Sequence, residues 1–321
     1  MNQVKGEKHS LMVLLVLFIG YTSVYVDKYT IGISLVTVSQ DLGFDPSQKG
    51  LILSAFFLGY TLFQIPMGYL NNRIGARPVL AVSIIIVGLF LVIFGFGYSL
   101  LFLVVIRFLS VVPKAPKIDL NAQKEKIKVP FSELLKDKQL WILLLSALFI
   151  NAANYGLTSW LASYLNEVRG ISISEVSYIS SLAGLCILIA GVVGGYFISR
   201  FFKGKEPIII FAFCVLGAFA VYGVYLFEQL ALSVICLCLC NIFLIMAFTT
   251  LMGLPHKLFQ QSHIATKYAA INSGGVLGGF FAPMIIGDLV NATNSYQSAF
   301  LFLALTLLAS GLIVLAIKKD Q

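Results

Sequence analysis

Residues 207–227 read PIIIFAFCVLGAFAVYGVYLF, a stretch without a single charged side chain. A helix rises 1.5 Å per residue, so a run of this length crosses the roughly 30 Å hydrocarbon core of a bilayer. Similar runs recur along the chain, which has 321 residues, 59% of them hydrophobic and 11% charged, and a mean hydropathy of +0.94. Ordinary soluble domains are about 25% charged. The composition therefore excludes a soluble globule.

The apolar runs predict helices, because lipid offers the backbone no hydrogen bonds and only helices or closed barrels can span it. The runs are also longer than the roughly 10 residues of a barrel strand. We predict an all-α polytopic membrane protein with about ten transmembrane helices, at residues 11–39, 50–70, 78–97, 99–113, 140–165, 175–200, 207–227, 230–253, 267–290 and 296–317.

A hydrophilic segment, PKAPKIDLNAQKEKIKVPFSELLKDKQ, separates the fourth and fifth predicted spans. Its many lysines and its prolines are typical of a solvated linker. We predict a shortened N-terminal helical bundle over residues 1–113, a cytoplasmic linker over 114–139 and a C-terminal six-helix bundle over 140–321.

The net charge of +8 comes from basic residues in short segments between spans. A positive excess in such loops marks the cytoplasmic side, and these loops alternate with less basic ones. This pattern predicts a multi-pass protein of the cell membrane with both termini in the cytoplasm. The first apolar run has no A-x-A-like end, so we expect it to be retained as a span. Nucleic acid is not an expected partner.

An internal repeat relates the two halves. GYLNNRIG (68–75) ends the second span, and GYFISRFF (195–202) ends the second span after the linker. Each contains Gly, a neutral polar residue four positions on and then Arg, namely Gly68, Asn72 and Arg73, and Gly195, Ser199 and Arg200. Two related bundles joined by a linker are typical of secondary transporters.

GYLNNRIGARPVL (68–80) resembles the signature G-x-L-x-D-R-x-G-R-R of the loop between helices 2 and 3 in the major facilitator superfamily. Residues 26–70, 155–172 and 271–300 are similar to its anion:cation symporter branch. The resemblance implies a transporter of small organic anions, of the sugar acid or aromatic carboxylate class. It also implies coupling to protons or sodium and alternating access.

The resemblance breaks after LFLVVIRFLS (101–110), where the chain passes directly to the linker. Superfamily members usually have six spans in each half, so this chain resembles a member that lacks part of helix 4 and helices 5 and 6. Two hypotheses follow. The chain is a working transporter, or it is a shortened, transport-inactive member or partner-dependent fragment.

Asp27 and Lys28 lie inside the first predicted span, where charges are costly and usually functional. Adjacent helix positions are about 100° apart, so the two side chains cannot point the same way. The resemblance implies that Lys28 holds the substrate carboxylate, and Asp27 is the candidate for proton coupling. The alternative is that both reach the membrane edge or pair within the bundle.

Two polar residues match cavity positions in the resembled branch. Tyr60 and Asn272 are implied to contact substrate. The alternative is that they join helices through hydrogen bonds.

The resemblance also implies a cytoplasmic gate. Its candidate residues are Gly68, Asn72, Arg73, Gly75, Arg77, Arg107, Gly195, Ser199 and Arg200. Asn72 stands where the family has Asp, and Ser199 takes its place in the repeat, so the usual ion pair with the helix 4 arginine, Arg107, cannot form with either. The alternative is that Arg73 and Arg77 only set the membrane orientation.

Motifs of enzyme chemistry are missing from the sequence: H-E-x-x-H, G-x-S-x-G and a P-loop do not occur. The five cysteines lie in apolar runs, where they pack as small hydrophobes. We predict no enzyme, cofactor or metal site, and we expect a small organic anion, protons or sodium and the lipid bilayer as partners.

Overall fold

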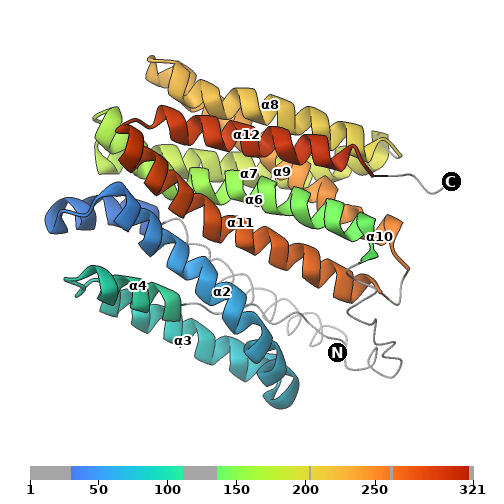
Figure 1. Cartoon of the computed structure of the whole chain (residues 1–321), viewed down its shortest axis with the longest axis horizontal. Coiled ribbons are helices and arrows are strands. Elements are labelled where there is room, and N and C mark those ends of the chain that lie inside the picture. Colours follow the sequence, from blue (N-terminus) through green and yellow to red (C-terminus); the bar gives the residue numbers. More distant parts are fainter. Residues whose placement is uncertain (1–29, 111–135, 202–203, 261–262, 318–321) are drawn as a thin grey trace, which may run out of the picture.

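The computed structural model of the chain describes residues 30–110, 136–201, 204–260 and 263–317. These residues are helical apart from short connections, which confirms the all-α class. Residues 30–42 form a helix that ends before Gly43. The other elements, labelled in Figure 1, are α2 (Pro46–Ile74), α3 (Ala76–Phe94), α4 (Leu100–Leu109), α6 (Lys138–Ser163), the π-helix η2 (Tyr164–Val168), α7 (Ile173–Phe201), α8 (Glu206–Leu226), α9 (Leu230–Gly253), α10 (Pro255–Leu258), α11 (Ile264–Thr293) and α12 (Gln297–Val314).

Six helical stretches within the described residues are long and apolar enough to cross a membrane. They are Lys138–Val168, Ile173–Gly194, Glu206–Leu226, Leu230–Leu258, Thr266–Thr293 and Gln297–Val314. They coincide with the six spans predicted after the linker. In the first half, Val82–Phe94 and Leu100–Leu109 are apolar but shorter, and the four spans expected there stay a prediction.

The helices form two groups (Figure 1). The helix over residues 30–42, α2, α3 and α4 make up the N-terminal group, and α6 to α12 make up the C-terminal group. Within the C-terminal group α12 packs on α6 and α8, and α9 packs on α7 and α8. Among the labelled helices the two groups meet where α2 packs on α11, and the helix over residues 30–42 approaches α6, where a Cβ on Gly32 would lie 3.1 Å from the Ser159 carbonyl oxygen. These contacts are where function must be sought, because motion between the groups has to change them.

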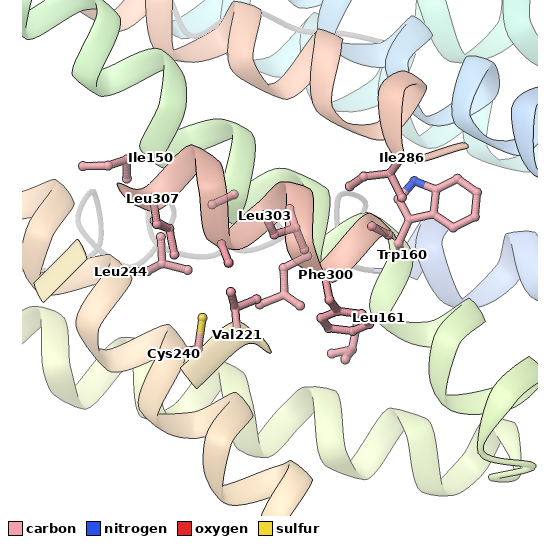
Figure 2. Close-up of a cluster of buried hydrophobic side chains, with 14 of the residues drawn as sticks. Ile150, Trp160, Leu161, Val221, Cys240, Leu244, Ile286, Phe300, Leu303 and Leu307 are labelled. Carbon is pink, nitrogen blue, oxygen red and sulfur yellow. The ribbon is translucent and has the colours of Figure 1, made fainter. Parts of the chain in front are cut away.

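A continuous apolar core stabilises the C-terminal group (Figure 2). Leu303 and Leu307 lie one turn apart on α12 and are almost fully buried. They pack in the same cluster as side chains from α6, α8 and α9, among them Ile150, Leu161, Val221, Cys240 and Leu244. Close packing of this kind holds the C-terminal helices together as one body.

A reciprocal cap fixes the first turn of α2. The Asp45 carboxylate accepts a hydrogen bond from the backbone N–H of Gln48 at 2.8 Å, and the Gln48 side chain accepts one from the N–H of Asp45 at 3.1 Å. This capping-box pattern satisfies backbone donors that a helix start would otherwise leave unpaired. It also sets the position of Lys49 and Gly50, which follow directly.

A single residue, Gly75, connects α2 to α3. Its φ is 89°, in the region that favours glycine because other residues would place their Cβ against the backbone. The turn at the far end of α2 therefore depends on this glycine.

Candidate functional site

Two glycines allow α2 and α11 to approach at the backbone. A Cβ atom on Gly50 would lie 2.6 Å from the carbonyl oxygen of Pro283, and one on Gly287 would lie 2.5 Å from that of Pro46. Trp160 of α6 donates its indole N–H to the same Pro283 carbonyl at 3.0 Å. Three helices, α2, α6 and α11, therefore meet around one backbone carbonyl.

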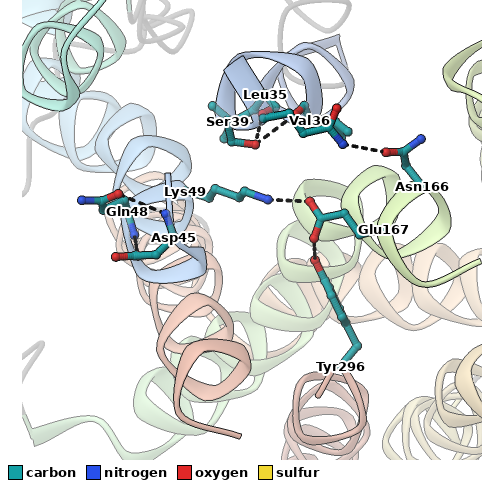
Figure 3. A network of polar contacts seen from close by, with 10 residues as sticks. Leu35, Val36, Ser39, Asp45, Gln48, Lys49, Asn166, Glu167 and Tyr296 are labelled. Carbon is teal, nitrogen blue, oxygen red and sulfur yellow. Dashed lines mark hydrogen bonds and ion pairs between the residues drawn. The ribbon is translucent and has the colours of Figure 1, made fainter. Parts of the chain in front are cut away.

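An ion pair joins the two groups beside these glycines (Figure 3). Lys49 Nζ of α2 lies 2.5 Å from Glu167 Oε1 of η2, and the Lys49 side chain is only 7% exposed. The other Glu167 oxygen accepts a hydrogen bond from the Tyr296 hydroxyl at 2.8 Å. Because Lys49 is buried, losing Glu167 would leave its charge without compensation at high cost.

A second polar pair lies next to the first. Gln40 of the helix over residues 30–42 donates its side-chain amide to the Asn166 side-chain oxygen at 3.2 Å. We call the whole set the interbundle contact, and it comprises Gln40, Lys49, Gly50, Asn166, Glu167, Gly287 and Tyr296.

The π-helical turn η2 presents Glu167 and Asn166 to the N-terminal group. Arg169 anchors this turn by donating to the Tyr164 hydroxyl at 2.9 Å and to backbone carbonyls at the end of α8, including those of Val224 and Glu228. Single π-turns of this kind occur frequently at functional sites. The Glu167 carboxylate is thus held by the C-terminal group while it binds the N-terminal group.

The surroundings of Tyr296 keep its hydroxyl a hydrogen-bond donor. Burial raises the pKa of Tyr296, and the neighbouring Glu167 carboxylate raises it further. The rings of Trp160 and Tyr164 lie 6.1 Å and 5.7 Å from the Tyr296 ring, centroid to centroid. The hydroxyl therefore stays protonated and keeps its hydrogen bond to Glu167.

Further along α2 the groups meet through aromatic side chains. We call this set the aromatic layer, and it comprises Phe56, Phe57, Tyr60, Tyr155, Val276 and Phe280. The ring centroids of Phe57 and Tyr155 lie 4.6 Å apart, and those of Phe56 and Phe57 lie 5.4 Å apart. The contact between the groups is apolar at this level.

Arg107 of α4 lies against the aromatic layer. Its guanidinium carbon lies 4.7 Å from the centroid of the Phe56 ring, and the residue is 2% exposed. At 1.5 Å per residue, Phe56 and Asn72 lie about 24 Å apart along α2. The structure therefore brings Arg107 to the aromatic layer and does not bring it to the turn at Gly75.

Of the four residues predicted to bind substrate or a proton, two lie in the part of the chain that the structure describes. Tyr60 belongs to the aromatic layer, and Asn272 lies on α11 one turn before Val276. Tyr60 and Asn272 are both partly buried. Asp27 and Lys28 lie outside the described residues, just before the start of the helix over residues 30–42.

The predicted gate residues other than Arg107 lie at two helix ends. Gly68, Asn72 and Arg73 belong to the last turns of α2, and Arg77 to the first turn of α3. Gly195, Ser199 and Arg200 belong to the last turns of α7, and Arg200 is exposed. The two copies of the repeat thus end corresponding helices.

Sequence reasoning missed Lys49, Glu167 and Tyr296 because it assigned them to polar loops at span ends. One signal was present, since Lys49 is a charge directly before the apolar run that begins near residue 50. Its partner lies 118 positions further along the chain, and no local pattern connects the two.

Metal chemistry has no visible support in the described residues. No group of three or more His, Cys, Asp or Glu side chains there is arranged to hold a metal ion, and the five cysteines are free thiols.

Two helix groups and an internal repeat are the architecture typical of two-bundle membrane transporters. The chain belongs to the Major Facilitator Superfamily, whose family model matches residues 17–114 and 108–283. The two matches meet at residues 108–114, where the sequence analysis places the loss of an internal segment.

Three similar proteins are named as probable transporters of organic acids. The chain is 34% identical over 129 residues to a probable galactarate/D-glucarate transporter of Pseudomonas putida. This alignment covers 38% of this chain and 28% of that relative. It is 22% identical to a probable sulfoacetate transporter of Cupriavidus necator, over 90% of this chain and 89% of the relative. It is also 22% identical to a probable galactarate/D-glucarate transporter of Bacillus subtilis, over 95% and 91%. The last alignment runs over 427 residues, more than this chain contains.

Solved structures support the fold. The chain is similar to a bacterial homolog of the human lysosomal transporter Spinster in its inward-facing and occupied conformation, with a TM-score of 0.74 and 15% identity over 95% of this chain and 94% of that chain. The inward-facing and unoccupied form gives a TM-score of 0.71.

Proposed function

We propose that this protein is a secondary transporter of small organic anions that is coupled to protons and works by alternating access. The observation that carries the proposal is the interbundle contact, where an ion pair and two glycines hold the groups together at one end. Transporters of this type work by moving one bundle against the other around a central site. A contact that is made in one state and broken in the other is what this motion requires.

The relatives support an anionic substrate. Galactarate and glucarate are sugar acids, and sulfoacetate is a small organic anion. We propose the sugar acid or aromatic carboxylate class for this chain.

The distribution of basic loops supports the orientation. We propose that residues 1–113, the linker over 114–139 and residues 140–321 form two bundles with both termini and the linker in the cytoplasm, in the cell membrane. The first span then ends outside, and the interbundle contact lies on the outer side.

The central site is assigned by charge and position. We propose that Lys28 holds the substrate carboxylate, that Tyr60 and Asn272 contact the substrate, and that Asp27 takes part in proton coupling. Arg107, a buried cation beside the aromatic layer, is proposed as a second anion-attracting residue, because charges at bilayer depth are usually functional. The remaining gate residues are proposed to close the cytoplasmic side.

Uptake into proteoliposomes tests the proposal. The full chain is expected to accumulate radiolabelled glucarate or a phthalate-like acid, and an inward proton gradient is expected to stimulate the uptake. Vesicles without protein, and vesicles with protein but no gradient, are the controls. A proton gradient that changes nothing would contradict coupling to protons, and a sodium gradient in parallel vesicles tests the other ion.

The second candidate is a shortened, transport-inactive family member or a fragment that depends on a partner. The break in the family match at residues 108–114 favours it. Absence of uptake for every acid, with a protein that unfolds cooperatively on heating, would support this candidate and refute the first.

Lys28→Ala is expected to weaken binding of the transported acid by about 30-fold or more, because removing one partner of a buried charge pair typically costs at least 2 kcal/mol. Equilibrium binding of the radiolabelled acid in detergent measures the effect. Lys136→Ala removes an exposed lysine before α6 and should leave the affinity unchanged. Equal affinities in the wild-type protein and Lys28→Ala would remove Lys28 from the site.

A further inference from the structure

We propose that Glu167 is a proton-binding residue of the transport cycle, whose charged form keeps the interbundle contact closed and whose protonated form releases it. This inference rests on the proposed function and assigns the proton a second site beside Asp27.

The position of Glu167 distinguishes it from the other paired acids of the described residues. The ion pairs Lys257–Glu206 and Lys267–Asp137 each join elements of the C-terminal group. Lys49–Glu167 joins α2 to η2 and so connects the N-terminal group to the C-terminal group. A change of charge on Glu167 therefore acts on the contact between groups, whereas a change on Glu206 does not.

The burial of Lys49 makes the contact sensitive to that charge. The Lys49 side chain is 7% exposed, while that of Glu167 is 27% exposed and can exchange protons with solvent. A neutral carboxyl does not compensate a buried ammonium, so protonation makes the closed contact unfavourable. Separation then returns Lys49 to water.

Five charged or titratable side chains lie near Glu167 in space or in sequence. Lys49 comes from α2, and Tyr296 comes from the turn before α12. Arg169, two residues along, donates instead to the backbone carbonyls of Phe227 and Glu228, directly after α8. Asp45 accepts from the Gln48 backbone, and Asp41 is exposed. The Tyr296 hydroxyl donates to one Glu167 oxygen, and Lys49 Nζ lies against the other.

The direction of the pH effect follows from linkage. The ion pair exists only in the closed contact and requires the charged carboxylate, so a proton binds more favourably once the groups have separated. Acid on this side of the membrane must therefore favour separation. In the proposed orientation this side is the outer one, where an inward proton gradient supplies the proton.

The test is a distance measurement between the groups in the full chain, in nanodiscs and without substrate. Spin labels replace Tyr98, in the turn between α3 and α4, and Leu230, at the start of α9, after the five native cysteines have been changed to alanine. Both label positions are exposed. In the otherwise wild-type protein the ratio of long to short distances should rise about threefold between about pH 8 and about pH 4, because a solvated carboxyl group of the glutamate type has a pKa of about 4.3.

Glu167→Gln mimics the protonated residue, so long distances should dominate at both pH values. Lys257→Met breaks an ion pair within the C-terminal group and is the matched control, which should respond to pH as the wild type does. The double variant Lys49→Met/Glu167→Gln leaves no buried unpaired charge and keeps the test valid if Glu167→Gln alone does not fold. Its distances should be independent of pH.

Three results would overturn the proposal: no pH response in the wild type, a wild-type response in Glu167→Gln, or a wild-type response in the double variant. Loss of the response in Asp27→Asn with retention in Glu167→Gln would assign the proton to Asp27 alone. Because no substrate is present, the outcome is independent of the uptake assay. A retained pH response without uptake would refute the proposed transport function and leave the proton site intact.

Discussion

Gly50→Leu is expected to prevent the interbundle contact from closing and to lower uptake by roughly 10- to 100-fold. The atoms that a Cβ on Gly50 would meet are backbone atoms, the Pro283 oxygen at 2.6 Å and the Cα of Gly287 at 3.3 Å. Backbone atoms cannot rotate away as a side chain does, so the helices must separate. Overpacking of this kind costs about 1–3 kcal/mol, and each 1.4 kcal/mol changes a population tenfold.

The matched control for this variant is Gly88→Leu on α3, where an added Cβ meets nothing within 4 Å. It should retain wild-type uptake. Spin-label distances across the contact should lengthen in Gly50→Leu at every pH, and Gly287→Leu should behave in the same way, because its Cβ would meet the Pro46 carbonyl oxygen. Wild-type distances in both glycine variants would show that the observed contact is not the closed state of the cycle.

Arg107→Met is expected to weaken anion binding by about 30-fold or more, which is the effect of removing a buried charge from its partner. Arg107 is almost fully buried and lies over the Phe56 ring, beside the aromatic layer that joins the groups. Met retains much of the side-chain volume but no charge. Equilibrium binding of the radiolabelled acid measures the effect.

A second variant separates charge from packing at position 107, and a variant at another position is the control. Arg107→Lys keeps the charge but loses the planar group that stacks on Phe56, so an intermediate affinity is expected. Lys205→Met removes an exposed lysine directly before α8 and should bind as the wild type does. A folded Arg107→Met protein with unchanged affinity would limit Arg107 to packing between α2 and α4.

The helices of the second half could be predicted to within three residues at each end. The span predicted at residues 207–227 is α8, Glu206–Leu226, and the span predicted at 230–253 is α9, Leu230–Gly253. An uninterrupted apolar run in lipid has one favourable conformation, because every backbone group must find its hydrogen bond within the helix. The family resemblance could likewise be read from the loop after α2 and is confirmed by the family match.

The neighbours of each polar side chain could not be predicted in this way, because they depend on how the helices pack. The spacing of Arg107 in LFLVVIRFLS places it in an apolar helix, but only the packing of α4 on α2 brings it to Phe56. The resemblance groups it with Asn72 near the end of α2, about 24 Å along that helix from Phe56. Helical periodicity defines a face but does not name the helix that the face will meet.

The sequence by itself determined that this chain is a two-group helical membrane protein of a transporter family, because hydrocarbon and backbone hydrogen bonding permit few other structures for such apolar runs. Only the tertiary structure decided that Lys49 meets Glu167 and that Gly50 meets Gly287. Both pairs join segments more than a hundred positions apart. Such contacts depend on how two separately folded groups pack together, and that packing leaves no periodic trace in either segment.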